Sequence, residues 1–85
     1  MRAKILESER KIFDGEITKI VIPAAEGEMC LLPHHAPIIT IMKAGAIRVF
    51  RTTSERPLTV DVTGGLFSFR RNNAVCILKT LDFPE

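Results

Sequence analysis

The stretch LTVDVT, residues 58–63, alternates apolar and polar residues. In an extended chain successive side chains point to opposite sides, so Leu58, Val60 and Val62 share one face. The threonines and Asp61 share the other face. This pattern is typical of a β-strand with one side in a hydrophobic core and the other in water.

Seven further segments, four to seven residues long, also have the character of strands. They are residues 4–7, 16–22, 28–32, 38–43, 46–52, 66–70 and 74–80. Turn-forming residues separate them, including Asp14-Gly15, Glu26-Gly27, Gly64-Gly65, residues 54–57 and Asn72-Asn73. The asparagine pair predicts a tight hairpin turn, because asparagine tolerates a positive φ angle.

No window of eleven or more residues keeps the apolar spacing of a helix uninterrupted. Short strands joined by turns, with an apolar side to cover, favour an all-β antiparallel sandwich of two sheets or a flattened barrel. The length of 85 residues fits one domain over residues 1–85. We therefore expect one β-sandwich domain.

The composition limits the classes of partner and compartment. The formal net charge of +2 is too small to indicate a polyanion-binding protein by itself. The N-terminus lacks the apolar segment of a secretory signal, so Cys30 and Cys76 are predicted to be reduced and buried. The longest apolar runs are far shorter than the ~20 residues of a membrane span.

Two predicted strands are apolar on both faces. In residues 38–42, Ile39 and Ile41 lie on one face and Ile38 and Met42 on the other; residues 46–51 behave similarly. One apolar face suffices for a sandwich, so the second is either rim packing or a docking surface. The sequence leaves these two alternatives open.

Candidate chemical groups are few and scattered. His34 and His35 are adjacent and point to opposite sides of an extended chain, which makes a shared metal ion unfavourable. Glu26 and Glu28 flank a turn, where carboxylates are normally solvated, and Gly64-Gly65 lacks the lysine and helix of a phosphate-binding loop. We expect no catalytic, cofactor or metal site.

Two other functions remain as alternatives at this stage. A small β-barrel could bind nucleic acid through basic side chains, namely Arg48, Arg51, Arg70 and Arg71, although Phe67 and Phe69 are better placed for core packing than for base stacking. An enzyme that uses Glu26, Glu28 or His35 is the weaker hypothesis, because no constellation of catalytic residues is evident.

The segment EGEMCLLPHHAPI, residues 26–38, closely resembles the N-terminal β-sandwich domain of the epsilon subunit of F-type ATP synthases. The family pattern at these positions is Gly-Glu, two small or apolar residues, an apolar pair ending in proline, then Gly-His-Ala-Pro and an apolar residue. Further similarities follow in the family's order, at residues 12–16, 44–48, 62–67 and 73–78. The resemblance extends from about Ile5 to Leu81.

The resemblance implies a sandwich of about ten strands without an active site. It implies a non-catalytic rotor subunit of the central stalk that binds the gamma subunit and the c-ring and couples ion translocation to ATP synthesis. By the same resemblance, Glu26, Gly27 and Glu28 face the c-ring, and the gamma-facing residues are His35, Ala36, Pro37, Ile38 and Met42. The location implied is peripheral, on the cytoplasmic face of a bacterial inner membrane or the matrix or stromal face in an organelle.

Three positions depart from the family pattern. Cys30 and His34 stand where the family has glycine, and Ala44 stands where it has proline. Family members commonly continue into a two-helix hairpin that restrains ATP hydrolysis, whereas this sequence ends at Glu85. The expectation is a sandwich domain without that inhibitory helical domain.

Overall fold

The computed structural model describes residues 1–51 and 56–79, and these residues form nine β-strands and no helix. The strands are β1 (Arg2–Glu7), β2 (Arg10–Glu16), β3 (Lys19–Ala24), β4 (Gly27–Leu31), β5 (Ile38–Met42), β6 (Gly45–Phe50), β7 (Leu58–Val62), β8 (Gly65–Arg70) and β9 (Asn73–Leu78). The predicted all-β class is confirmed.

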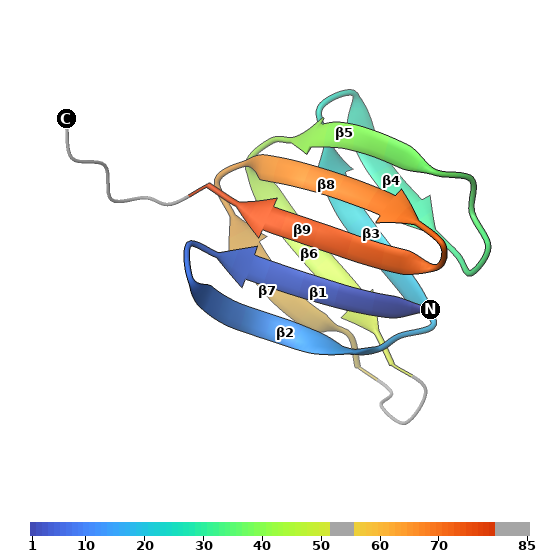
Figure 1. Ribbon diagram of the computed structural model, residues 1–85. Helices are drawn as coiled ribbons and strands as arrows, with labels where there is room; N and C mark the ends of the chain where they lie inside the picture. The colour runs from blue at the N-terminus through green and yellow to red at the C-terminus, as the bar shows by residue number, and fades with distance from the viewer. Residues whose placement is uncertain (52–55, 80–85) are drawn as a thin grey trace, which may run out of the picture.

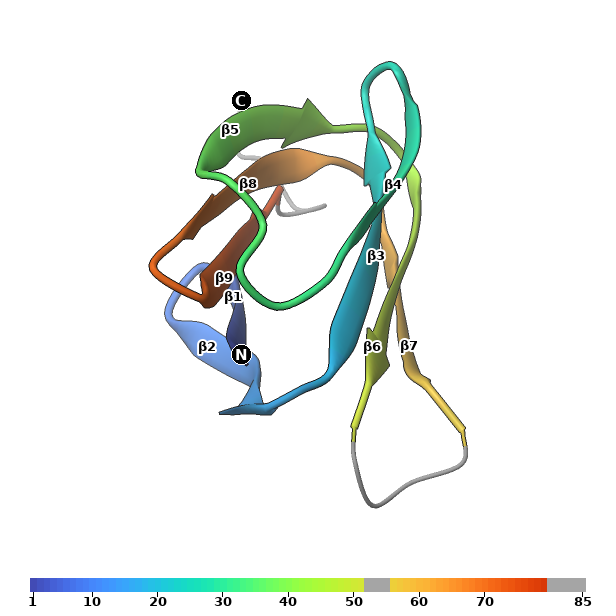
Figure 2. The ribbon, with the colours of Figure 1, turned by 90° about the vertical axis from the view of Figure 1, so that its right-hand side faces the viewer.

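The strands form one hydrogen-bonded path that folds over on itself. Its order is β2-β1-β9-β8-β5-β3-β6-β7, and β4 pairs with the other edge of β3. Every pairing is antiparallel except that of β1 with β9, which is parallel. Strands β5 and β3 are paired through a single pair of residues, Ala24 and Met42. Two layers result, β2-β1-β9-β8-β5 and β4-β3-β6-β7 (Figures 1 and 2).

The core lies between these two layers. Phe67 and Phe69 of β8 are at most 1% exposed, as the sequence predicted. They share a cluster of buried side chains with Ile20 and Ile22 of β3 and Ile47 of β6. Each such side chain contributes about 1.5–3 kcal/mol on burial, so the alternation of the strands is what holds the layers together.

Strand β2 was not predicted, and the strand expected over residues 16–22 is displaced to β3. Asp14-Gly15 is not a turn: these residues pair with Lys4 and Ala3 inside the β1–β2 ladder. The chain instead reverses at Ser8, whose φ is 56°. Because β2 lies at the edge of the layer, many of its side chains are polar and its alternation is weak in the sequence.

The β8–β9 turn lies one residue earlier than predicted. Its central residues are Arg71 and Asn72, with φ angles of 52° and 61°, whereas Asn73 already belongs to β9. Two successive positive φ angles are the geometry of a type I′ hairpin. Residues 52–55 and 80, which include parts of the predicted turn and strand ends, lie outside the described residues.

Both cysteines are free, but only Cys76 is buried; Cys30 is exposed, which corrects its predicted burial. Cys30 lies in the middle of β4, between the half-buried Met29 and the buried Leu31. Since side chains alternate along a strand, an inward Met29 and Leu31 require an outward Cys30.

Candidate interaction surface

The acidic turn between β3 and β4 carries the residues expected to face the c-ring. Glu26 and Glu28 are both exposed, and Gly27 has a φ of 136° with nothing within 4 Å of the place where a Cβ would be. The Glu28 carboxylate accepts a hydrogen bond from the Arg48 guanidinium at 3.0 Å, so this side chain is held over the outside of the β4-β3-β6 layer. Glu26 is the more available of the two carboxylates.

The loop between β4 and β5 carries three of the residues expected to face gamma. His35, Ala36 and Pro37 are all exposed. The His35 ring meets Phe69 edge-on, with the ring centroids 6.0 Å apart, and its Nδ1 lies 2.7 Å from the Ala36 carbonyl oxygen. The loop therefore rests against β8 and presents its Ala-Pro segment to the outside.

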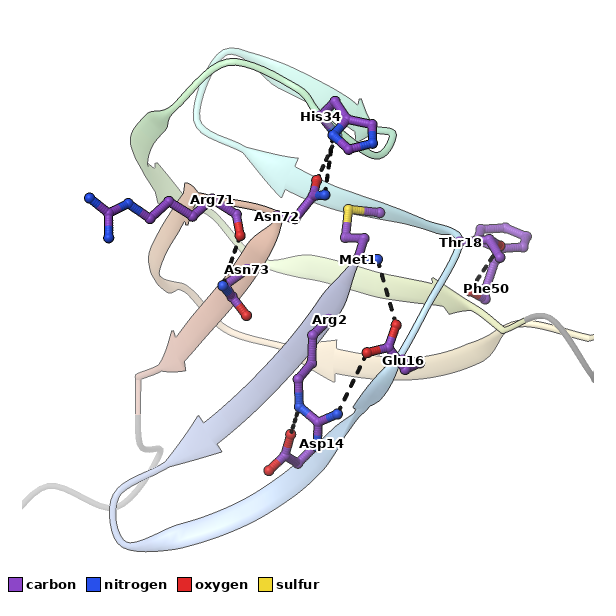
Figure 3. Close-up of polar contacts among 10 residues, drawn as sticks. All are labelled: Met1, Arg2, Asp14, Glu16, Thr18, His34, Phe50, Arg71, Asn72 and Asn73. Carbon is purple, nitrogen blue, oxygen red and sulfur yellow. Dashed lines mark hydrogen bonds and ion pairs between the residues drawn. The ribbon is translucent and has the colours of Figure 1, made fainter.

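The neighbouring His34 connects this loop to the β8–β9 turn. Its backbone N–H donates to the Asn72 Oδ1 atom at 2.6 Å, and the Asn72 Nδ2 atom lies 3.2 Å from its Nδ1 atom (Figure 3). Thirty-eight positions separate the two residues in the sequence. No sequence pattern predicts such a contact, because it depends on how the two layers are packed.

The remaining two gamma-facing candidates point inward. Met42 is 2% exposed and belongs to the core, and Ile38 is half-buried and packs against it. The opposite side of β5 carries Ile39 and Ile41, which are 74% and 63% exposed. The sequence separated the two faces of this strand correctly but did not determine which face is inside, since both are apolar.

Ile39 and Ile41 belong to a larger apolar surface, which we call the outer face: Ile39, Ile41, Leu66, Val75 and Ile77. Ile41 pairs with Leu66 across β5 and β8, and Leu66 pairs with Ile77 across β8 and β9. Directly paired side chains lie within contact distance, so Ile41, Leu66 and Ile77 form a continuous row over three adjacent strands. In the next row Ile39 and Val75 lie on either side of Ser68. Figure 1 shows these strands side by side.

A hollow of about 490 Å³ lies where the outer face meets the β4–β5 loop. Its lining combines the loop residue Pro37 with Ile38, Ile39, Ser68, Phe69 and Arg70 of β5 and β8. The lining is mostly apolar, with one guanidinium beside it. Such a hollow suits an apolar side chain of a partner protein.

The charged groups that border the outer face are mainly basic. By alternation, Lys43 continues the outward row of β5, Arg70 that of β8, and Lys4 pairs with Val75. Asp14 of β2 lies 3.1 Å from the Arg2 guanidinium, as Figure 3 shows. It also lies 3.2 Å from the Lys11 ammonium. The hydrogen bond from Lys11 is the main cause that lowers the pKa of Asp14, against partial desolvation.

Two of the arginines expected for a nucleic-acid surface, Arg48 and Arg70, lie on opposite sides of the molecule. Arg48 projects from the outside of the β4-β3-β6-β7 layer, since Ile47 and Val49 beside it are buried. Arg70 projects from the outside of the other layer, next to the buried Phe69. A polyanion would need a continuous basic surface, and the two layers separate these side chains.

Within the described ranges, 1–51 and 56–79, no three His, Cys, Asp or Glu side chains are grouped so that they could hold a metal ion. In the same part of the chain, no helix has the length and hydrophobicity needed to span a membrane.

Comparison with known proteins tests the resemblance seen in the loop sequences. Residues 1–80 match the family described as the ATP synthase delta/epsilon chain, β-sandwich domain. The chain belongs to this family.

The ATP synthase epsilon chain of Dehalococcoides mccartyi is 34% identical over 85 residues, which are 100% of this chain and 59% of that protein. The epsilon chain of Neisseria meningitidis serogroup A is 36% identical over 66 residues, 78% of this chain and 47% of that protein. The chain thus spans about half to three-fifths of these epsilon chains.

Solved structures show the same fold at low sequence identity. A chain of the Euglena gracilis mitochondrial ATP synthase, in a structure of its OSCP, F1 and c-ring, matches with a TM-score of 0.82 and 18% identity, over 89% of this chain and 48% of that chain. A chain in a structure of the Tetrahymena thermophila mitochondrial ATP synthase central stalk and c-ring matches with a TM-score of 0.75 and 13% identity. The match covers 93% of this chain and 63% of that chain. The epsilon family's sandwich fold is therefore shared by distant ATP synthases.

Proposed function

We propose that this protein is a non-catalytic subunit of the central stalk of an F-type ATP synthase and binds the gamma subunit and the c-ring. In this role it couples ion translocation to ATP synthesis from a peripheral position at the membrane, on the cytoplasmic, matrix or stromal side. The observation that carries the proposal is the outer face. Four of its large apolar side chains are between 44% and 74% exposed on adjacent strands. A contiguous apolar patch of this kind is typical of a protein-interaction site.

The gamma contact is proposed to combine the outer face with the loop residues His35, Ala36 and Pro37. Ile39 and Ile41 replace Met42 in this contact, because Met42 is in the core. Ile38 contributes through the hollow that it lines. A rotor joint must transmit torque without slipping, and a closely packed apolar contact with a polar rim meets that need.

The c-ring contact is proposed for the acidic turn, Glu26-Gly27-Glu28. The turn adjoins the end of β5, because the Ala25 N–H donates to the Ile41 carbonyl oxygen at 2.9 Å and the Lys43 N–H donates to that of Pro23 at 2.8 Å. The exposed Glu26 carboxylate can accept charge-assisted hydrogen bonds from polar loops of a ring, while Glu28 already accepts one from Arg48. The two proposed contacts therefore adjoin each other on the molecule without overlapping.

The substitution Ile41→Asp tests the gamma contact. It places a charge in the middle of the outer face, where a partner would have to desolvate it, so we expect binding to purified gamma subunit to weaken at least about tenfold. Thr59→Asp is the matched control, since Thr59 is an exposed strand residue of the opposite layer. Binding is measured by calorimetry, and folding of both variants by circular dichroism. Equal affinities for the two variants would disprove this assignment of the face.

A further inference from the structure

The contact between His34 and Asn72 fixes the hydrogen-bonding state of both side chains. The Asn72 Oδ1 atom accepts the His34 backbone N–H at 2.6 Å, so the amide group cannot be turned around without losing that bond. The Asn72 Nδ2 atom, 3.2 Å from His34 Nδ1, is then a donor. Consequently Nδ1 must be the unprotonated nitrogen of a neutral imidazole that carries its proton on Nε2.

The backbone of the loop depends on this contact. His34 has a φ of 71°, a left-handed conformation that a residue with a side chain rarely adopts. Asn72 is itself in the left-handed region at 61°, at the tip of the β8–β9 turn. The turn itself is tied to the N-terminus, because the Arg2 N–H donates to the Asn72 carbonyl oxygen at 2.9 Å. Asn72 is thus a firmly held support for a strained loop residue.

We propose that His34 and Asn72 form a proton-dependent latch that holds the β4–β5 loop on the β8–β9 turn. A second proton on His34 would occupy Nδ1, and that N–H would then face the Nδ2–H donors of Asn72. One of the two hydrogen bonds of the latch is replaced by a repulsive contact between donors. The bond from the His34 backbone is then the only one of the two that remains in the latch.

The charged groups around the latch would not stabilise an extra proton on His34. The turn contributes Arg70 and Arg71, of which Arg71 extends away from the pair (Figure 3). The start of β1 contributes Arg2 and the N-terminal ammonium, which Glu16 approaches to 3.6 Å. The loop itself contributes His35. Neither residues 32–37 nor residues 70–73 include a carboxylate.

The latch matters for binding because the loop that it holds carries His35, Ala36 and Pro37. This consequence rests on the proposed function, whereas the latch itself does not. When His34 is protonated, one of the two latch bonds is lost and the loop is held less firmly, so that its part of the gamma contact has to be ordered on binding. We expect affinity for gamma to be about fivefold weaker near pH 5.5 than near pH 8, the factor that corresponds to one lost hydrogen bond.

Nuclear magnetic resonance of the 85-residue chain tests the latch directly. The expected result is a strongly downfield His34 amide proton and an ordered loop near pH 8, and near pH 5.5 an upfield shift of that proton and a more mobile loop. Asn72→Asp should reverse this dependence, because a carboxylate accepts from the backbone N–H and also from a protonated Nδ1. His34→Gly should remove it, because it takes away the imidazole, while glycine adopts the same φ without strain and keeps the backbone of the loop. His35→Gln leaves His34 as the only histidine of the chain, so the pH response of the His34 amide proton should persist in this variant.

Two results would overturn the latch: an His34 amide and loop that do not change between the two pH values, or a loop response that persists in His34→Gly. Gamma affinity is measured separately on the same samples. If the amide responds as expected while gamma affinity is independent of pH, the latch stands and the loop's place in the gamma contact is refuted.

Discussion

At the scale of single residues, the two cysteines show how position in the sheet determines chemistry. Cys76 is completely buried, and this burial raises the pKa of its thiol from 9.0 to about 12. Cys30 lies on the exposed side of β4 and remains accessible. We therefore expect one fast-reacting thiol in the native chain and a second only after unfolding.

The raised pKa of Cys76 also predicts how the free energy of unfolding depends on pH. Above about pH 9 the thiol of the unfolded chain ionises while buried Cys76 stays protonated, so the unfolded state binds fewer protons. The free energy of unfolding should then fall by up to ~1.4 kcal/mol per pH unit between about pH 9 and 12, with no such loss below pH 9. Urea unfolding at pH 8 and 10 measures this, with Cys76→Ala as control. If the variant loses as much stability as the wild type, Cys76 is not the cause.

At the scale of elements, the glycines that begin β8 and β4 differ in how well they would tolerate a side chain. A Cβ on Gly65, whose φ is 151°, would collide with the Ile77 carbonyl oxygen of the paired strand and lie 3.1 Å from the Leu78 Cα. A Cβ on Gly27, whose φ is 136°, would meet nothing within 4 Å. Both positions have unfavourable backbone angles for alanine, but only Gly65 also lacks space.

We therefore predict that Gly65→Ala destabilises the fold much more than Gly27→Ala. Backbone strain alone should cost Gly27→Ala about 1–2 kcal/mol, whereas Gly65→Ala must also displace the β8–β9 pairing and should cost more than ~3 kcal/mol. Urea unfolding of both variants, followed by circular dichroism, gives the two values. Similar losses would show that β9 moves aside easily.

The strands also show how much of the fold the sequence determines. Residues 58–62 of LTVDVT form β7, because their alternation leaves only one way to bury them, and the turn residues located most other strands. Residues 38–43 were predicted as a strand, yet the inward placement of Met42 was not, since either face could enter a core. The edge strand β2 and the His34–Asn72 contact depend on tertiary pairing, which local sequence does not encode.

At the scale of the whole molecule, the arrangement of the layers gives the two proposed contacts separate positions. The outer face belongs to the β5-β8-β9 layer, and the acidic turn extends from the β3–β4 hairpin of the other layer (Figure 2). The layers meet at Ala24 and Met42, close to both. Neither contact requires the other to be intact, so single substitutions should separate them.

Glu26→Lys should keep gamma binding but impair coupling. Glu26 is exposed and not part of the outer face, so reversing its charge leaves the fold and the gamma contact unchanged while it repels groups that a carboxylate would attract. In ATP synthase reassembled with this variant and reconstituted into vesicles, ion-driven ATP synthesis should fall relative to Glu9→Lys, an exposed glutamate in the β1–β2 turn. Unchanged synthesis with Glu26→Lys would exclude a c-ring contact through this carboxylate, and loss of gamma binding would mean that the acidic turn belongs to the gamma contact instead.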